Sequence, residues 1–187
     1  MGFIHLVKPD WSLFLDRDGV INIRPVGDYV KSVEEFSFIE GVIESIALLS
    51  IHFRYIFVVT NQQGVGKKLM SSEKLNDIHQ YMEDMIHQKG GRISRIYTCT
   101  DLEMKTPNCR KPSISMALLA KSDFPDVDFA KSIMIGDSDS DMEFGYKAGM
   151  YTVMVGDQKT NVKPHLRCGN MKEFTQLILE TINKTNL

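Results

Sequence analysis

Short apolar runs recur along the chain and predict a set of buried strands. Five runs rich in Ile, Val, Phe or Tyr stand at 12–15, 55–59, 92–97, 132–135 and 152–155. Most of them are apolar at every position, which is typical of parallel strands with helices on both faces. A further edge strand is expected near 165–168.

Segments of helical period lie between these runs. Leu75, Ile78, Met82 and Met85 form one stripe of a helix that Ser71 or Ser72 caps and that runs to about residue 88. The other predicted helices span 42–50, 139–148 and 173–183, and one starts at Pro112. Alternating strands and helices predict an α/β fold with a doubly wound, mainly parallel sheet. We expect one domain over 1–187, because no linker or repeat interrupts the pattern.

Composition and charge limit the classes of function. The chain has 187 residues, is 43% hydrophobic and carries a net charge of -2, which disfavours a nucleic-acid or membrane partner. No apolar run approaches the roughly 18 residues of a spanning helix, and no signal peptide is evident. We therefore expect a cytoplasmic protein, acting as a monomer. Free thiols are favoured for Cys99, Cys109 and Cys168, because three cysteines cannot all pair within one chain.

Polar side chains gather where the predicted strands end. The first strand runs into Asp16-Arg17-Asp18-Gly19 and the second into Thr60-Asn61. The third leads through a loop to Arg110-Lys111, and the fourth to Asp137 and Asp141. Ligands of such sheets bind beyond the carboxyl ends of the strands. Carboxylates at close quarters repel one another, so the cluster implies a cation, and oxygen ligands favour Mg²⁺.

Four motifs carry a family resemblance. In chain order they are "DRDGV", "VVTNQQGV", "CRKP" and "IGDSDSDM". Together they resemble the haloacid dehalogenase (HAD) superfamily of phosphatases, over about 13–155. Within it, "DRDGVIN", "DYV", "FIEGV", "TNQQGV" and "CRKP" are similar to the subgroup of D-glycero-D-manno-heptose 1,7-bisphosphate phosphatase and histidinol-phosphate phosphatase.

The resemblance implies a role for each strand-end residue. Asp16 would be the nucleophile that forms an aspartyl-phosphate, and Asp18 the general acid and then base. Mg²⁺ would be held by Asp16, the Asp18 carbonyl and Asp137, with Asp141 behind them. Thr60 and Lys111 would hold the transferring phosphoryl group. The remaining residues expected to shape or bind the substrate site are Gly19, Asn61 and Arg110.

The loop at about 99–110 departs from the family pattern. Many relatives place four zinc ligands there, as a Cys-x-His pair and a Cys-x-Cys pair. Here Asp101 and Pro107 replace two of them, and only Cys99 and Cys109 remain. Because structural zinc normally takes four protein ligands, we predict no zinc at this loop.

The spacing of the motifs leaves no room for a separate cap domain. We expect an open site, covered by a flap at about 22–38 and by the substrate-facing loop at 99–110. Arg110 is placed to grip a second phosphate, which favours a heptose 1,7-bisphosphate-type sugar phosphate. The alternatives are a histidinol-phosphate phosphatase and, in a different class, a non-catalytic HAD-like binding protein. Asp139 is expected to cap a helix and to bind no ligand.

Overall fold

A computed structural model describes residues 2–185, which form one sheet of six parallel strands. The strand order is β3-β2-β1-β4-β5-β6. Their bounds are β1 (Ser12–Leu15), β2 (Tyr55–Asn61), β3 (Arg95–Cys99), β4 (Ser132–Gly136), β5 (Tyr151–Val155) and β6 (Leu166–Cys168). The chain winds to one side of β1 and then to the other, so the winding direction reverses between β1 and β4. The doubly wound α/β prediction is confirmed, and this switch point is where such sheets bind ligands.

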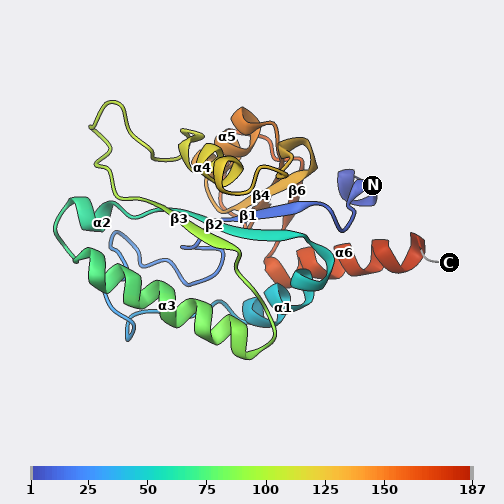
Figure 1. Cartoon of the computed structure of the whole chain (residues 1–187), viewed down its shortest axis with the longest axis horizontal. Helices are drawn as coiled ribbons and strands as arrows, with labels where there is room; N and C mark the ends of the chain where they lie inside the picture. Colours follow the sequence, from blue (N-terminus) through green and yellow to red (C-terminus); the bar gives the residue numbers. More distant parts are fainter. Residues whose placement is uncertain (1, 186–187) are drawn as a thin grey trace.

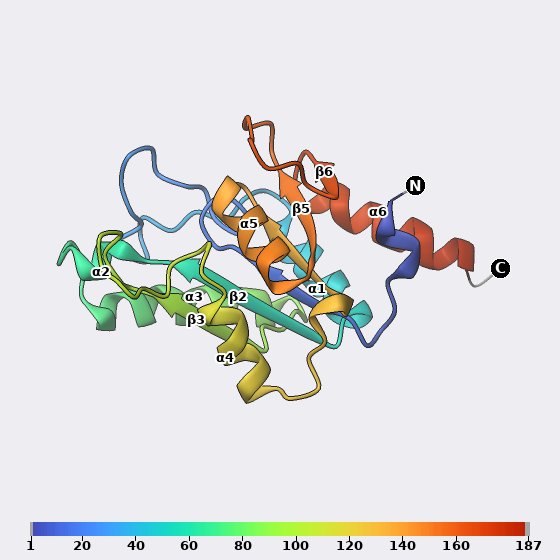
Figure 2. The ribbon, with the colours of Figure 1, turned by 90° about the horizontal axis from the view of Figure 1, so that it is seen from above.

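Helices cover both faces of the sheet (Figure 1). On one face lie α1 (Val42–His52), α3 (Ser72–Gln88) and α6 (Met171–Thr185), and on the other α4 (Ser115–Asp123) and α5 (Asp139–Ala148). Seen from above, α6 extends beyond the β6 end of the sheet, next to the start of the chain (Figure 2). Three short turns complete the helical segments, namely η1 (Phe3–Leu6), α2 (Gln63–Gly66) and η2 (Phe129–Lys131).

Each face of the sheet has its own apolar core. Leu13 and Leu15 of β1 belong to the cluster beneath α1, α3 and α6. Phe14, between them in the sequence, belongs to the cluster on the side of α4 and α5. Successive side chains of a strand point to opposite faces, so an entirely apolar strand is what a sheet covered on both sides requires.

Two predicted starts were wrong by three residues each. The third strand begins at Arg95, not at 92, because the Arg92 side chain is held by carbonyls at the end of α1 and after it, including Ser50 O at 2.8 Å. The helix predicted from Pro112 begins at Ser115. Before it the chain makes a turn closed by Ser113 N donating to Arg110 O at 2.7 Å.

Residues 22–38, the predicted flap, form an irregular excursion between β1 and α1. A short antiparallel bridge between Asn22 and Phe38 closes the base of this excursion. No separate cap domain is inserted within residues 2–185.

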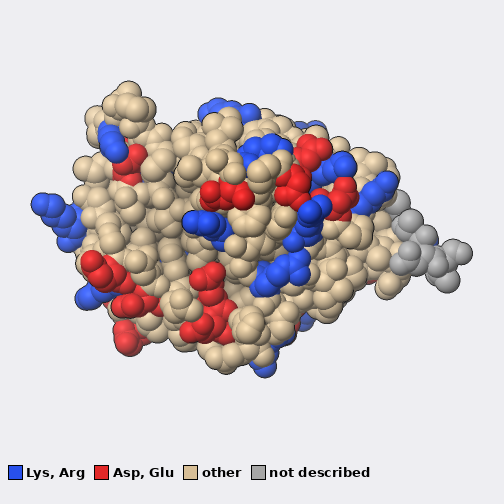
Figure 3. Space-filling model, viewed as in Figure 1, with Lys and Arg blue, Asp and Glu red and all other residues tan. Residues whose placement is uncertain are grey.

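The described surface has mixed charge. On the face in Figure 3, lysine and arginine side chains are interspersed with aspartate and glutamate and form no continuous basic stripe. Among the described residues, no helix combines the length and the apolarity needed to cross a membrane.

Candidate active site

The predicted residues meet at the carboxyl ends of β1, β2 and β4. Parallel pairing aligns Leu15 with Val58 on one side and with Ile135 on the other, so the segments that follow start level with one another. They border a cavity of about 290 Å³. The residues that line it come from four parts of the chain. The strand ends supply Asp16, Asp18 and Asn61, and helix α5 supplies Asp141. The flap supplies Arg24, Pro25, Asp28 and Tyr29, and the loop and the residue after it supply Arg110 and Lys111.

Lys111 is buried between two carboxylates. Its Nζ lies 2.8 Å from Asp16 Oδ1 and 2.6 Å from Asp141 Oδ1, and it donates to Val59 O at 2.8 Å. Burial alone would lower the pKa of Lys111, but Asp141 and Asp16 outweigh it and raise the pKa above its usual value. The ammonium charge is therefore fixed next to Asp16. The resemblance placed Asp141 behind Asp137, whereas the structure shows that its carboxylate also meets this lysine.

Asp16 is oriented by two donors on the same oxygen. Besides Lys111, the backbone N of Arg17 donates to Asp16 Oδ1 at 2.7 Å. Burial raises the pKa of Asp16 to about 7, and the neighbouring Asp141 and Asp137 add to the increase while Lys111 opposes it. A further cation at this carboxylate would favour its ionised form.

Three buried carboxylates, those of Asp16, Asp137 and Asp141, each offer an oxygen within 4.8 Å of the others. Asp137 Oδ1 is buried and accepts no hydrogen bond among the described residues, although Arg24 Nη2 lies 3.0 Å from it. Burial raises the pKa of Asp137 to about 6 against the opposing effect of Arg24. An all-oxygen cluster in which a buried oxygen accepts no hydrogen bond fits a hard divalent cation such as Mg²⁺.

Gly19 is packed directly against this cluster. A Cβ on Gly19 would lie 1.9 Å from Asp137 Oδ2, and its φ of +93° is in the region that favours glycine. Gly19 was expected to shape or bind the substrate site; the structure shows that only a hydrogen fits between the turn after β1 and Asp137.

The carboxylate of Asp18 receives hydrogen bonds on both oxygens. Arg17 Nη2 and Asn22 Nδ2 donate to Oδ1 at 3.0 and 2.9 Å, and Gln62 Nε2 donates to Oδ2 at 2.7 Å. Burial raises the pKa of Asp18, but Arg17 and these hydrogen bonds outweigh it, so the net pKa is below its usual value.

Thr60 and Asn61 occupy the end of β2. Thr60 is buried, and its hydroxyl oxygen accepts from Gln62 Nε2 at 2.8 Å, which leaves its own hydrogen available to another acceptor. Asn61 is bound to the backbone of Lys111, accepting from Lys111 N at 2.9 Å. Asn61 therefore anchors the segment that carries the lysine. Arg110, next to it, has a buried Nη1 with no hydrogen-bond partner among the described residues.

Several residues that shape the site were missed by the sequence analysis. Arg24 reaches back from the flap to Asp137 and, at 3.5 Å, to Asp16 Oδ2. Asn22 and Gln62 hold Asp18. Asn22 and Gln62 lie within or beside the quoted motifs, which was a usable signal. Arg24 stands in an irregular segment, where no periodicity indicates the direction of a side chain.

The expected cap of the helix at 139–148 was misplaced by one residue. The N-cap of α5 is Ser138, whose N and Oγ both donate to Asp141 Oδ2, at 3.1 and 2.5 Å. Asp139 is the first helical residue, and it accepts hydrogen bonds from Thr160 and Asn161 instead. The capping box therefore also orients the Asp141 carboxylate towards Lys111.

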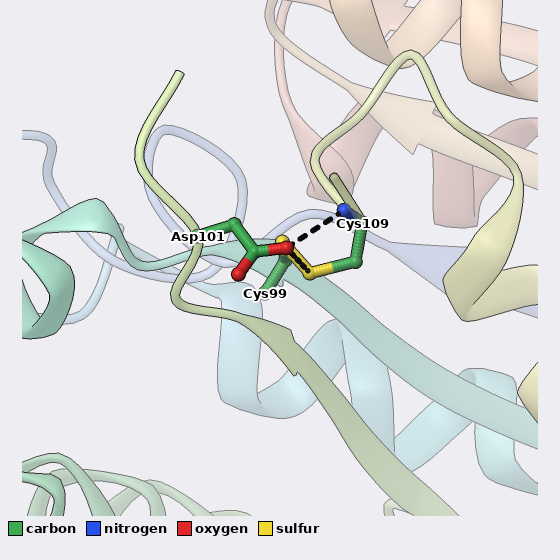
Figure 4. Close-up of side chains that lie close together, drawn as sticks. All are labelled: Cys99, Asp101 and Cys109. Atoms are coloured by element: carbon green, nitrogen blue, oxygen red, sulfur yellow. Dashed lines mark hydrogen bonds between the residues drawn. A yellow bond between two sulfur atoms is a disulfide. The ribbon is translucent and has the colours of Figure 1, made fainter. Parts of the chain in front are cut away.

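The expectation of free thiols was wrong for two of the three cysteines. Cys99 at the end of β3 and Cys109 form a disulfide (Figure 4). Cys168 is free and buried. The carboxylate of Asp101 accepts a hydrogen bond from Cys109 N at 3.1 Å and lies 3.2 Å from its sulfur. The bond closes the substrate-facing loop immediately before Arg110. The absence of zinc there stays a prediction.

Comparison with known proteins supplies the family. A model of the HAD-hydrolase-like family matches residues 108–182. The D-glycero-α-D-manno-heptose-1,7-bisphosphate 7-phosphatase of Mycobacterium tuberculosis is 39% identical over 136 residues, which cover 73% of this chain and 72% of that protein. The chain belongs to the HAD superfamily of phosphatases.

Two further likenesses extend over nearly the whole chain. The enzyme of the same name from Campylobacter jejuni is 35% identical over 170 residues, 90% of this chain and 96% of that protein. The solved D,D-heptose 1,7-bisphosphate phosphatase of B. bronchiseptica, complexed with magnesium and phosphate, matches with a TM-score of 0.80 and 27% identity. That match covers 91% of this chain and 98% of the solved one. The predicted HAD resemblance is confirmed.

Proposed function

We propose that this HAD phosphatase is a Mg²⁺-dependent phosphomonoesterase that hydrolyses a bisphosphorylated sugar of the heptose 1,7-bisphosphate type. The observation that carries the proposal is the position of Asp16. Its carboxylate is fixed by Lys111, lies two residues from Asp18, and borders a cavity that Arg110 also lines. The related proteins are named for this substrate.

Asp16 is proposed to attack the phosphorus and form an aspartyl-phosphate while the sugar alkoxide leaves. Asp18 gives a proton to the leaving oxygen, and then takes a proton from the water that hydrolyses the aspartyl-phosphate. Because the pKa of Asp18 lies below its usual value in the protein alone, this role requires the negative charge of the bound phosphate to raise that pKa. Lys111, and Thr60 through its free hydroxyl hydrogen, stabilise the charge on the phosphoryl oxygens.

Asp16, Asp137 and the Asp18 backbone carbonyl would hold Mg²⁺, with Asp141 beside them. When bound, the ion offsets the repulsion between the Asp16 carboxylate and the phosphate dianion. Two unit charges about 4 Å apart interact by about 4 kcal/mol at an effective dielectric constant near 20. Because the phosphate dianion carries two charges, its repulsion with the Asp16 carboxylate is roughly twice that value.

Arg110 is proposed to bind the second phosphate. Its guanidinium has a buried nitrogen without a partner among residues 2–185 and lies at the wall of the cavity. A planar guanidinium can bind a phosphate through two parallel hydrogen bonds. A substrate with a single phosphate would leave this nitrogen unsatisfied.

We propose a cytoplasmic enzyme, since such charged sugars do not cross membranes unaided, and we propose that it acts as a monomer.

The test is phosphate release with Mg²⁺ from both anomers of the heptose 1,7-bisphosphate, from histidinol phosphate and from p-nitrophenyl phosphate. Asp16→Asn should abolish all activity. Asp10→Asn, which removes an exposed carboxylate paired with Lys131, should leave activity unchanged. Phosphate release from p-nitrophenyl phosphate alone would refute the proposed substrate class. No release from any of the four would overturn the enzyme proposal.

A further inference from the structure

Arg17, between the two catalytic aspartates in the sequence, is fully buried. None of its side chain is exposed, and its guanidinium packs 6.0 Å from the centre of the Phe36 ring. A buried guanidinium is unfavourable unless it is paired. Its carboxylate partner is Asp18, to which Nη2 donates at 3.0 Å. The orientation of Arg17 and that of Asp18 are therefore tied together.

The other end of this guanidinium is held by a helix outside the site. Arg17 Nη1 lies 3.2 Å from Nε2 of His79, on the buried face of α3. Burial, with Arg17 adding to it, lowers the pKa of His79 to about 3. The imidazole is thus neutral at physiological pH. Since Arg17 can only donate, His79 Nε2 is the acceptor and its proton is on Nδ1.

We propose that His79, acting through Arg17, is a positioning residue that sets the orientation of the Asp18 carboxyl group for proton transfer. The inference rests on the proposed function. His79 fixes the guanidinium, and the guanidinium fixes Oδ1. Asn22 and Gln62 also donate to Asp18. These two donors should keep Asp18 in the site when the His79 contact is lost. Oδ1 would no longer lie beside a fixed guanidinium, however, and the carboxyl group would shift from its position.

A misdirected general acid has a recognisable kinetic consequence. A sugar alkoxide is a strongly basic leaving group and needs the proton of Asp18 as the bond breaks. The p-nitrophenolate ion is a weak base and leaves without it. General acid catalysis typically increases the rate 10²- to 10⁴-fold. A misoriented Asp18 would reduce this rate enhancement only for the sugar substrate. The ratio kcat/KM reports the steps up to departure of the leaving group, so later hydrolysis of the aspartyl-phosphate does not obscure the comparison.

The experiment compares His79→Leu, which removes the acceptor, with His79→Gln, whose side-chain oxygen can accept from Arg17. For His79→Leu we expect kcat/KM for the heptose bisphosphate to fall at least about 10-fold more than kcat/KM for p-nitrophenyl phosphate. His79→Gln should recover most of that difference. His87 is an exposed histidine of the same helix. The control variant His87→Leu should change kcat/KM for neither substrate.

Equal losses on both substrates, or no recovery with glutamine, would overturn the inference while leaving the proposed function intact. If the wild-type protein hydrolyses neither substrate, the proposed function fails first and the inference with it. Should His79→Leu not fold, Arg17→Lys provides the same test. A lysine keeps the charge but lacks the planar fork whose two nitrogens meet Asp18 and His79, so it must show the same selective loss on the sugar substrate or refute the proposal.

Discussion

Replacing Gly19 by alanine tests the geometry of the carboxylate cluster. A Cβ built on Gly19 lies 1.9 Å from Asp137 Oδ2 and 2.5 Å from Asp137 Cγ, and ordinary contact begins near 3.4 Å. The carboxylate would have to retreat by about 1.5 Å, and misplacements near 1 Å can cost about 10²-fold in rate. We expect Gly19→Ala to weaken Mg²⁺ binding and to lower kcat/KM at least about 100-fold.

The same substitution also strains the backbone, and that effect must be separated. Alanine in the left-handed region costs about 1–2 kcal/mol. Gly90→Ala is the matched control, because Gly90 has a φ of +80° with nothing within 4 Å of its added Cβ. Backbone strain alone should lower the Tm of both variants by a similar amount, about 2–8 °C for a chain of this length.

Metal binding, measured by isothermal titration with Mg²⁺ or Mn²⁺, should distinguish the two variants. Only Gly19→Ala should lose affinity and activity together. If Gly19→Ala bound the metal and turned over substrate as Gly90→Ala does, the close approach of the β1 turn to Asp137 would not matter, and the assignment of Asp137 as a metal ligand would be refuted.

Three further outcomes are expected. Arg110→Ala should lower kcat/KM about 10- to 100-fold for a bisphosphate but not for p-nitrophenyl phosphate, because hydrogen bonds to charged groups contribute about 1.5–3 kcal/mol; equal effects would argue against a second phosphate site. Thiol titration of the unreduced protein in denaturant should find only Cys168, and reduction should add Cys99 and Cys109; three thiols before reduction would contradict the pairing. For His79, the pKa of about 3 in the folded protein is below the ordinary 6.5, so the unfolded chain binds the extra proton between these values. The contribution of neutral His79 to the free energy of unfolding is therefore complete above about pH 6.5, and it is lost at up to about 1.4 kcal/mol per pH unit as the pH falls. Urea unfolding at pH 7 and pH 5 should show a smaller decline in this free energy for His79→Gln than for the wild type. An unchanged decline would mean that His79 is not buried in its neutral form.

The sequence alone was sufficient to locate the site residues that stand at strand ends. Asp16, Thr60 and Asp137 stand at the carboxyl ends of apolar strands, so the parallel register alone brings them together. Contacts made by the flap and by the substrate-facing loop were harder to predict, because these irregular segments have no hydrophobic periodicity that indicates side-chain direction. The approach of Arg24 to Asp137 and the pairing of Cys99 with Cys109 depend on the path of those segments, which local sequence does not encode.

The start of α4 illustrates the same limit at one boundary. Proline is favoured in the first turn of a helix, so Pro112 was a reasonable first residue. The adjoining Lys111, however, must keep its Nζ on Asp16 and its backbone on Asn61. The chain meets both requirements with a turn, and α4 begins only at Ser115. The demands of the site thus displaced a local helix signal.

Charge balance links the features of the site. The buried carboxylates of Asp16, Asp137 and Asp141 face one buried cation, Lys111, and among the described residues the other cation in ion-pair contact with them is Arg24, whose side chain is 47% exposed. Breaking a buried ion pair by removing one partner typically costs about 3–5 kcal/mol, so Lys111 is as necessary to the fold of this corner as to its chemistry. A divalent cation would balance the two carboxylates that Lys111 leaves unmatched. The half-exposed guanidinium of Arg24 would then be able to face the cavity, where the substrate brings the next negative charge.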